Sequence, residues 1–117
     1  MTCVLVIDDE PDIRLLSRLM LTRSGYEVVE AASAEEGLRA VEEYRPALVL
    51  VDLRMPGMGG WAFAERAHEL WPDLQVVVVS AHTHPEYVDR ARSLGCGYLT
   101  KPFTTEQLVE QAVRADG

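Results

Sequence analysis

The sequence predicts an α/β fold in which a parallel sheet carries helices on both faces. Short apolar runs, many of them β-branched, recur along the chain, and each is followed by a segment whose apolar residues have helical spacing. Five such pairs alternate strictly. Strict alternation favours parallel strands, because each right-handed crossover returns the chain to the same end of the sheet. At 117 residues the chain is expected to form one domain, residues 1–117, with its own core.

The first strand is predicted over residues 3–7, and a helix follows it from about Pro11. Proline is favoured in the first turn of a helix, and Ser24-Gly25 is a typical stop. The residues of this helix that are expected to face the core are Ile13, Leu16, Leu19 and Met20. The pattern then predicts a second strand over residues 26–31.

Residues 33–36 read Ser-Ala-Glu-Glu, a capping box that opens a second helix, and this helix is expected to end before Pro46. The next run, residues 47–51, is uninterrupted and apolar, and Pro56-Gly57 lies shortly after it. Such a run is typical of a strand buried on both faces. Asp52 therefore closes the third strand at its carboxyl end.

The second half of the chain is divided by the same signals. Its predicted elements are a helix over 60–70, a strand over 74–79, a helix over 85–94, a strand over 96–100 and a helix opened by residues 104–107. Pro85 and Gly95 mark the start and stop of the middle helix. Residues 104–107 read Thr-Thr-Glu-Gln, a second candidate capping box.

Composition excludes several classes of partner. A net charge of −8 and a pI near 4.8 repel nucleic-acid phosphates and anionic membrane surfaces, so neither is expected to bind directly. No apolar stretch approaches the ~20 residues that cross a bilayer, and signal-peptide features are lacking, so a cytoplasmic location is expected. The two cysteines have neither metal-ligand spacing nor the number for a disulfide framework.

Acidic residues follow two of the predicted strands. Asp8 and Asp9 come directly after the first strand, and Asp52 ends the third. Ligands of open α/β sheets bind at the carboxyl ends of the strands. If these two strands are neighbours, three carboxylates converge, and their mutual repulsion is costly unless a hard cation lies among them. The sequence therefore predicts a cation site at this edge.

The chain resembles, over its whole length, the receiver domain of two-component response regulators, and chemotaxis regulators in particular. The residues that carry the resemblance are Asp8 and Asp9, Asp52 with Leu53 to Gly57 after it, Ser80, Tyr98 and Lys101-Pro102. The resemblance implies a flavodoxin-like (βα)5 fold with strand order 2-1-3-4-5. It also implies that a histidine kinase or a phosphotransfer protein donates a phosphoryl group to Asp52. Lys101 is the only lysine among eleven basic residues.

Roles for the other residues follow from the same resemblance. Asp9, Asp52 and the backbone carbonyl of Arg54 are expected to bind Mg²⁺, or Mn²⁺, directly, and Asp8 through water. Lys101 and Ser80 are expected to contact the phosphoryl oxygens and so to join Asp52 in the catalytic set. Ser80 and Tyr98 form the expected switch.

A downstream effector protein, or an output domain on the same chain, would then read the surface around the fourth helix, fifth strand and fifth helix. Lys101-Pro102 is expected to be cis. The resemblance also implies that Arg54 and His82 occupy variable positions that flank the phosphoryl group, so both are expected to affect its lifetime.

Other functions remain open on the sequence alone. Asp8, Asp9 and Glu10 could merely complement a helix N-terminus, and Asp52 could be a turn-forming aspartate before the Pro-Gly loop. Lys101 by itself could be a solvated side chain. A degenerate receiver could serve as a constitutive docking or dimerisation module. A phosphatase with an aspartyl-phosphate intermediate would need an aspartate where Arg54 stands. The chain is therefore not expected to be an enzyme beyond self-catalysed phosphoryl transfer to Asp52 and autodephosphorylation.

Overall fold

The computed structural model describes residues 2–116 and contains five strands that alternate with five helices. The elements are β1 (Cys3–Ile7), α1 (Pro11–Arg23), β2 (Glu27–Ala31), α2 (Ala34–Tyr44), β3 (Leu48–Asp52), α3 (Gly59–Leu70), β4 (Gln75–Ser80), α4 (Pro85–Ser93), β5 (Gly97–Thr100) and α5 (Thr105–Asp116). The predicted alternation is confirmed. Within residues 2–116, none of the helices has the length and apolar character to span a bilayer.

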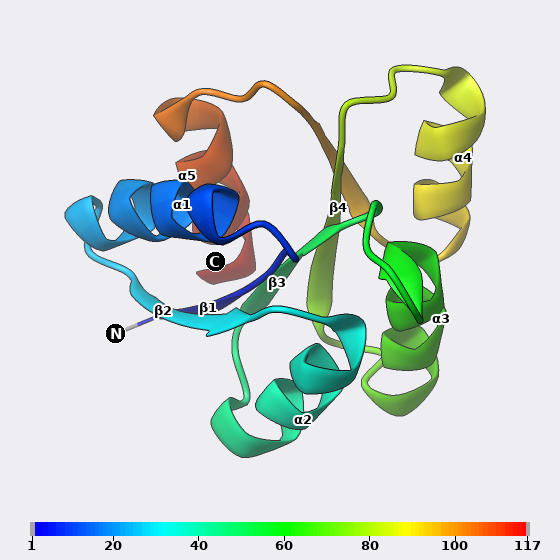
Figure 1. The fold of residues 1–117 in the computed structure, drawn as a ribbon, viewed down its shortest axis with the longest axis horizontal. Coiled ribbons are helices and arrows are strands. Elements are labelled where there is room, and N and C mark those ends of the chain that lie inside the picture. The colour runs from blue at the N-terminus through cyan, green and yellow to red at the C-terminus, as the bar shows by residue number, and fades with distance from the viewer. Residues whose placement is uncertain (1, 117) are drawn as a thin grey trace.

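All strand pairs are parallel, and the sheet order is β2-β1-β3-β4-β5, as expected. Helices α1 and α5 cover one face of the sheet, and α2, α3 and α4 lie on the other side (Figure 1). The central strand β3 is buried along its whole length. Its carboxyl end therefore lies between those of β1 and β4, where side chains from three elements can meet.

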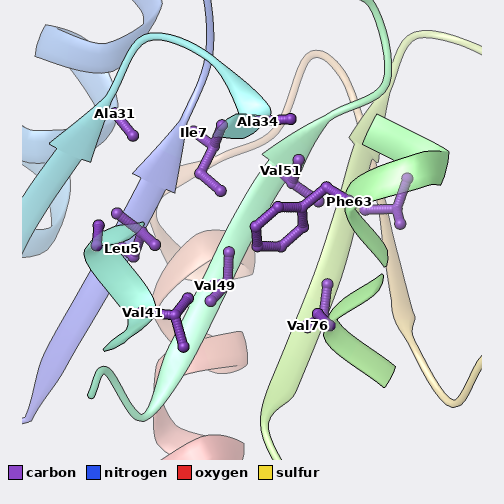
Figure 2. Packing of buried hydrophobic residues seen from close by; sticks show 12 residues of the cluster. Leu5, Ile7, Ala31, Ala34, Val41, Val49, Val51, Phe63 and Val76 are labelled. Carbon is purple, nitrogen blue, oxygen red and sulfur yellow. The ribbon is translucent and has the colours of Figure 1, made fainter. Parts of the chain in front are cut away.

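Successive strand residues point into two separate cores. Leu5 of β1 packs with Phe63 of α3 in the core beneath α2 and α3 (Figure 2). Its neighbour Val4 packs in the other core with Leu21 of α1 and Leu108 of α5. All five side chains are fully buried. Truncation of a fully buried Phe or Leu typically costs about 2–5 kcal/mol, so these two cores hold the strand ends in place.

The buried face of α1 differs from the predicted one. Leu16 and Leu19 were expected to face the core, but they are 48% and 42% exposed. The fully or nearly buried residues of this helix are Ser17 and Leu21. Because α1 carries apolar residues around much of its circumference, spacing alone does not identify the side that packs on the sheet. The helix thus presents an apolar surface to solvent, to which Leu15 also contributes.

Candidate functional site at the carboxyl edge of the sheet

The site is assembled by the register of three neighbouring strands. Ile7 of β1 lies beside Val51 of β3, so Asp8 and Asp52, the next residue in each chain segment, come together at the same edge. On the other side of β3, Asp52 lies beside Val79 of β4. Ser80 follows directly and thus ends β4 at this edge. The parallel arrangement brings together residues that are far apart in the sequence.

Three carboxylates form the centre of the site. Asp8, Asp9 and Asp52 each offer an oxygen, and these oxygens all lie within 4.8 Å of one another. Asp8 and Asp52 are only 3% and 4% exposed. Carboxylate oxygens at this spacing suit Mg²⁺, which prefers hard oxygen ligands and retains several waters. The donor set therefore fits the cation that the sequence predicts.

The environment of Asp8 shows the cost of gathering these charges. Burial raises the pKa of Asp8 to about 6, and the negative charge of Asp52 contributes in the same direction. The backbone N–H of Glu10 and the charge of Lys101 act against this rise. The N–H of Glu10 donates to Asp8 Oδ1 over 3.0 Å. A divalent cation would favour the ionised carboxylate and so relieve the repulsion.

Lys101 supplies the positive charge of the site. Its Nζ lies 2.9 Å from Asp52 Oδ2 and 3.7 Å from Asp8 Oδ2. Burial alone would lower the pKa of Lys101, but the hydrogen bond to Asp52 and the charges of the nearby acidic groups raise it overall. The ammonium is therefore charged at neutral pH, and it contacts Asp52, the residue expected to accept the phosphoryl group.

Asp52 and the start of α3 are in close contact. The backbone N–H of Arg54 donates to Asp52 Oδ1 over 3.2 Å, so both carboxylate oxygens are hydrogen-bonded. A Cβ added at Gly60 would lie 2.4 Å from the carbonyl oxygen of Asp52. Only glycine allows α3 to approach this strand end so closely. Sequence reasoning assigned no such role to Gly60, although the run of glycines before α3 was a visible signal.

Ser80 is 2% exposed, and two hydrogen bonds connect it through His82, in the loop after β4, to Tyr98 of β5. The N–H of His82 donates to Ser80 Oγ over 3.1 Å, and the hydroxyl of Tyr98 donates to the carbonyl of His82 over 2.6 Å. The His82 ring stacks on Tyr87 of α4, with 4.6 Å between the ring centroids. Ser80 and Tyr98 are thus connected through the backbone of one intervening residue.

The sequence-predicted residues are brought together to different degrees. Asp8, Asp9, Asp52 and Lys101 form one cluster, and Ser80 ends the adjacent strand. Tyr98 lies in β5 and is half-buried. The Lys101-Pro102 bond is cis, as the resemblance implied. A contact that the sequence argument missed is the hydrogen bond from the Arg14 guanidinium to the Asp8 carbonyl, which joins residues six apart.

Comparison with known proteins gives one consistent family. The family model described as the response regulator receiver domain matches residues 4–113. The chain is 38% identical over 112 residues to the transcriptional regulatory protein KdpE of Mycobacterium tuberculosis, a match that covers 93% of this chain and 48% of that protein. It is 28% identical over 106 residues to the sporulation initiation phosphotransferase F of Bacillus subtilis, with 90% and 86% covered.

Comparison with solved structures gives proteins of the same family. The structure of the Vibrio cholerae chemotaxis protein CheY4 matches with a TM-score of 0.91 and 30% identity, and the match covers 98% of both chains. The chain spans about half the length of KdpE, and about a quarter of the C4-dicarboxylate transport regulator DctD of Rhizobium meliloti. Receiver domains of this family bind Mg²⁺ at an aspartate cluster such as the one described above. From the match of the family model to nearly the whole sequence, together with the fold, the chain belongs to the receiver domains of two-component response regulators.

Proposed function

We propose that this chain is a phosphorylation-dependent switch in which Asp52 accepts a phosphoryl group from a histidine kinase or a phosphotransfer protein. The observation that supports it best is the contact of Lys101 Nζ with Asp52 Oδ2, at 2.9 Å, beside a cluster of three carboxylates. A carboxylate oxygen attacks the phosphorus and the bond to the donor nitrogen breaks. The pair of electrons from that bond stays on the donor imidazole, which takes up a proton.

The other residues stabilise the charge that moves during the transfer. Asp9, Asp52 and the backbone carbonyl of Arg54 would hold Mg²⁺, with Asp8 acting through water, and the cation would neutralise the incoming phosphoryl oxygens. Lys101 donates to a phosphoryl oxygen from another side, and Ser80 offers its hydroxyl. Because both lie at strand ends of a packed sheet, they are positioned before the phosphoryl group arrives.

The switch follows from the connection between Ser80 and Tyr98. If Ser80 moves toward the phosphoryl group, the backbone of His82 moves with it, since its N–H is bonded to Ser80 Oγ. The bond from Tyr98 to the His82 carbonyl then changes as well. The surface formed by α4, β5 and α5 would carry this change to an effector protein or to a linked output domain.

The donor also needs a surface next to Asp52. An apolar pocket of about 300 Å³ opens beside Lys101, and its lining consists of Ile13, Leu16, Ala81, Lys101, Pro102 and Phe103. Leu16 of α1 is 48% exposed, so part of this apolar lining is open to solvent. A phosphodonor protein that docks here would bring its phosphohistidine to the site, which supports a protein rather than only a small molecule as the physiological donor.

The decisive experiment is phosphorylation by a small acyl phosphate in the presence of Mg²⁺, followed by mass spectrometry. We expect a single base-labile phosphoryl group on Asp52, because this carboxylate belongs to the aspartate cluster and makes the shorter of the two contacts with Lys101. Asp52→Asn should abolish the modification. Asp73→Asn, an exposed aspartate in the loop before β4, is the matched control and should leave it unchanged. A folded, Mg²⁺-binding protein that gains no phosphoryl group would instead favour a constitutive docking module.

Arg54 and His82 should set how long the phosphoryl group survives. Arg54 follows the phosphoacceptor by two residues and is exposed, while the ring of His82 is held against Tyr87. We expect Arg54→Ala and His82→Ala to change the dephosphorylation rate without preventing phosphorylation, because neither side chain belongs to the acidic cluster. The measurement is the decay of phosphoprotein after removal of the donor. Unchanged lifetimes in both variants would contradict this role.

A further inference from the structure

Arg14 of α1 joins three elements next to the acidic cluster. Its side chain is only 18% exposed. Nη1 donates to the backbone carbonyl of Asp8 over 2.7 Å, and Nε lies 3.4 Å from Glu30 Oε1 at the end of β2. In Figure 1, α1 lies over the β1 and β2 side of the sheet. The Arg14 side chain therefore starts close to both of the segments that it contacts. The guanidinium is thus held between β2 and the loop that carries the acidic pair.

The backbone of Asp8 is anchored on both sides. Its N–H donates to the carbonyl of Ala31 over 3.1 Å, and its carbonyl accepts from Arg14. The side chain of Asp8 also accepts from the N–H of Glu10. Arg14 provides the charged contact to the backbone of Asp8, and charge-assisted hydrogen bonds are about twice as strong as neutral ones. Loss of the guanidinium would leave a carbonyl of a buried residue without its donor.

The need for such an anchor follows from the charges themselves. Asp8, Asp9 and Asp52 repel one another, and the loop between β1 and α1 could relax by moving its carboxylates apart. Part of the binding free energy of a cation would then be used to bring the carboxylates together again, which weakens binding. An anchored loop avoids that cost, because the ligands are in position before the cation arrives.

We propose that Arg14 is a positioning residue that holds the Asp8-Asp9 loop in the arrangement required for divalent cation binding. This inference rests on the proposed function, since it concerns the same cation site. A positioning role predicts a change in cation affinity opposite to the one that charge alone predicts. A positive charge close to a cation site opposes cation binding by simple Coulomb repulsion, so its removal should strengthen binding. If Arg14 acts by positioning, its removal weakens binding.

The test is the Mg²⁺ dissociation constant of Arg14→Ala and Arg14→Lys, measured by calorimetry well below the melting temperature of each variant. We expect Mg²⁺ affinity to fall by about tenfold in Arg14→Ala, because outer-shell partners of metal ligands typically contribute that much. Arg14→Lys should also lose affinity, because an ammonium cannot bridge Glu30 and the Asp8 carbonyl as a planar guanidinium does. Thermal unfolding in a chelator reports separately whether each variant is folded.

Arg18→Ala is the matched control. In the described part of the chain, Arg18 binds the same Glu30, over 2.9 Å, without a hydrogen bond to Asp8, and its side chain is 54% exposed. Its removal should leave Mg²⁺ affinity nearly unchanged. Equal or tighter Mg²⁺ binding by Arg14→Ala and Arg14→Lys would overturn the positioning role. Failure of the unmodified protein to bind Mg²⁺ would instead overturn the proposed function.

Discussion

At the scale of single residues, the site depends on a balance of charges within a few ångströms. Asp8 and Asp52 are almost completely buried, and their carboxylates are compensated by one ammonium. Burial would normally expel such charges from a core. They persist at the sheet edge because Lys101 and backbone N–H groups bind them, and because a cation can be accommodated among them.

The role of Lys101 leads to a prediction with two parts. Lys101→Met removes the counter-charge of Asp52, so the Mg²⁺-free protein should lose about 1–3 kcal/mol of unfolding free energy, the typical cost of leaving a buried partner unpaired. The same change should strengthen Mg²⁺ binding, since it removes a competing cation. Denaturant unfolding with and without Mg²⁺ measures both effects. A variant as stable as the original protein without Mg²⁺ would show that the ion pair contributes nothing.

The Lys101→Met variant also serves as a comparison for the Arg14 variants. Both changes delete a positive charge near the same carboxylates, but only Arg14 is bonded to the backbone of the loop that carries them. Opposite changes in Mg²⁺ affinity would separate the electrostatic effect of a charge from its effect on geometry. Sequence reasoning could place Lys101 at this edge, since it follows a strand end. It could not pair Arg14 with Asp8, because that contact depends on how far α1 extends over β2.

At the scale of elements, α1 shows where patterns become ambiguous. Its apolar residues occupy several sides of the helix, and only packing decides which side is buried. The structure buries Leu21 completely and leaves Leu16 48% exposed. Other helices show the same ambiguity at single positions. In α5, Leu108 and Ala112 are fully buried as their spacing predicts, but Val113, which the same spacing places inward, is 56% exposed.

The two leucines of α1 provide a matched pair for measurement. Leu21→Ala should lower the unfolding free energy by about 2–5 kcal/mol, the usual cost of deleting a buried leucine. Leu16→Ala should change it by no more than about 0.5 kcal/mol, because most surface substitutions lie in that range. Urea denaturation of both variants is sufficient. Similar losses for the two would contradict the observed orientation of α1.

A related expectation concerns transfer from a protein donor. Because Leu16 lines the pocket beside Lys101, its replacement by aspartate should slow transfer from a phosphodonor protein. Transfer from a small acyl phosphate needs no docking surface and serves as the internal comparison. Equal rates from the two kinds of donor would remove this pocket from the proposed docking surface.

At the scale of the whole molecule, stability and function compete at the acidic edge. Charges that the cation requires are held close together in the folded chain and are far apart in the unfolded one. The folded protein therefore has a different proton affinity from the unfolded chain, and the pH dependence of unfolding reports the difference. The net charge of −8 adds a general repulsion, which salt screens more effectively than it screens the buried cluster.

The raised pKa of Asp8 determines how the unfolding free energy of the Mg²⁺-free protein changes with pH. Its value rises from 3.8 to about 6 on folding, so the folded state binds the proton more tightly. The stabilising effect is present below pH 3.8 and is lost as the pH rises to about 6. Relative to Asp8→Asn, the Mg²⁺-free protein should therefore lose about 2 kcal/mol across this interval, allowing for solvent screening. Denaturant unfolding of both proteins measures their unfolding free energies at each pH. Parallel pH profiles would refute the predicted contribution of Asp8.

The sequence by itself determined the order and type of the elements, the parallel sheet and the positions of Asp8, Asp9, Asp52, Ser80 and Lys101 at strand ends. These features are local, because strand periodicity, capping residues and turns are encoded within a few neighbouring positions. The tertiary structure decided which side of α1 is buried, that α3 approaches Asp52 so closely that position 60 must be glycine, and that Arg14 reaches the Asp8 carbonyl. These contacts depend on the distance and angle between packed elements, which no local pattern specifies.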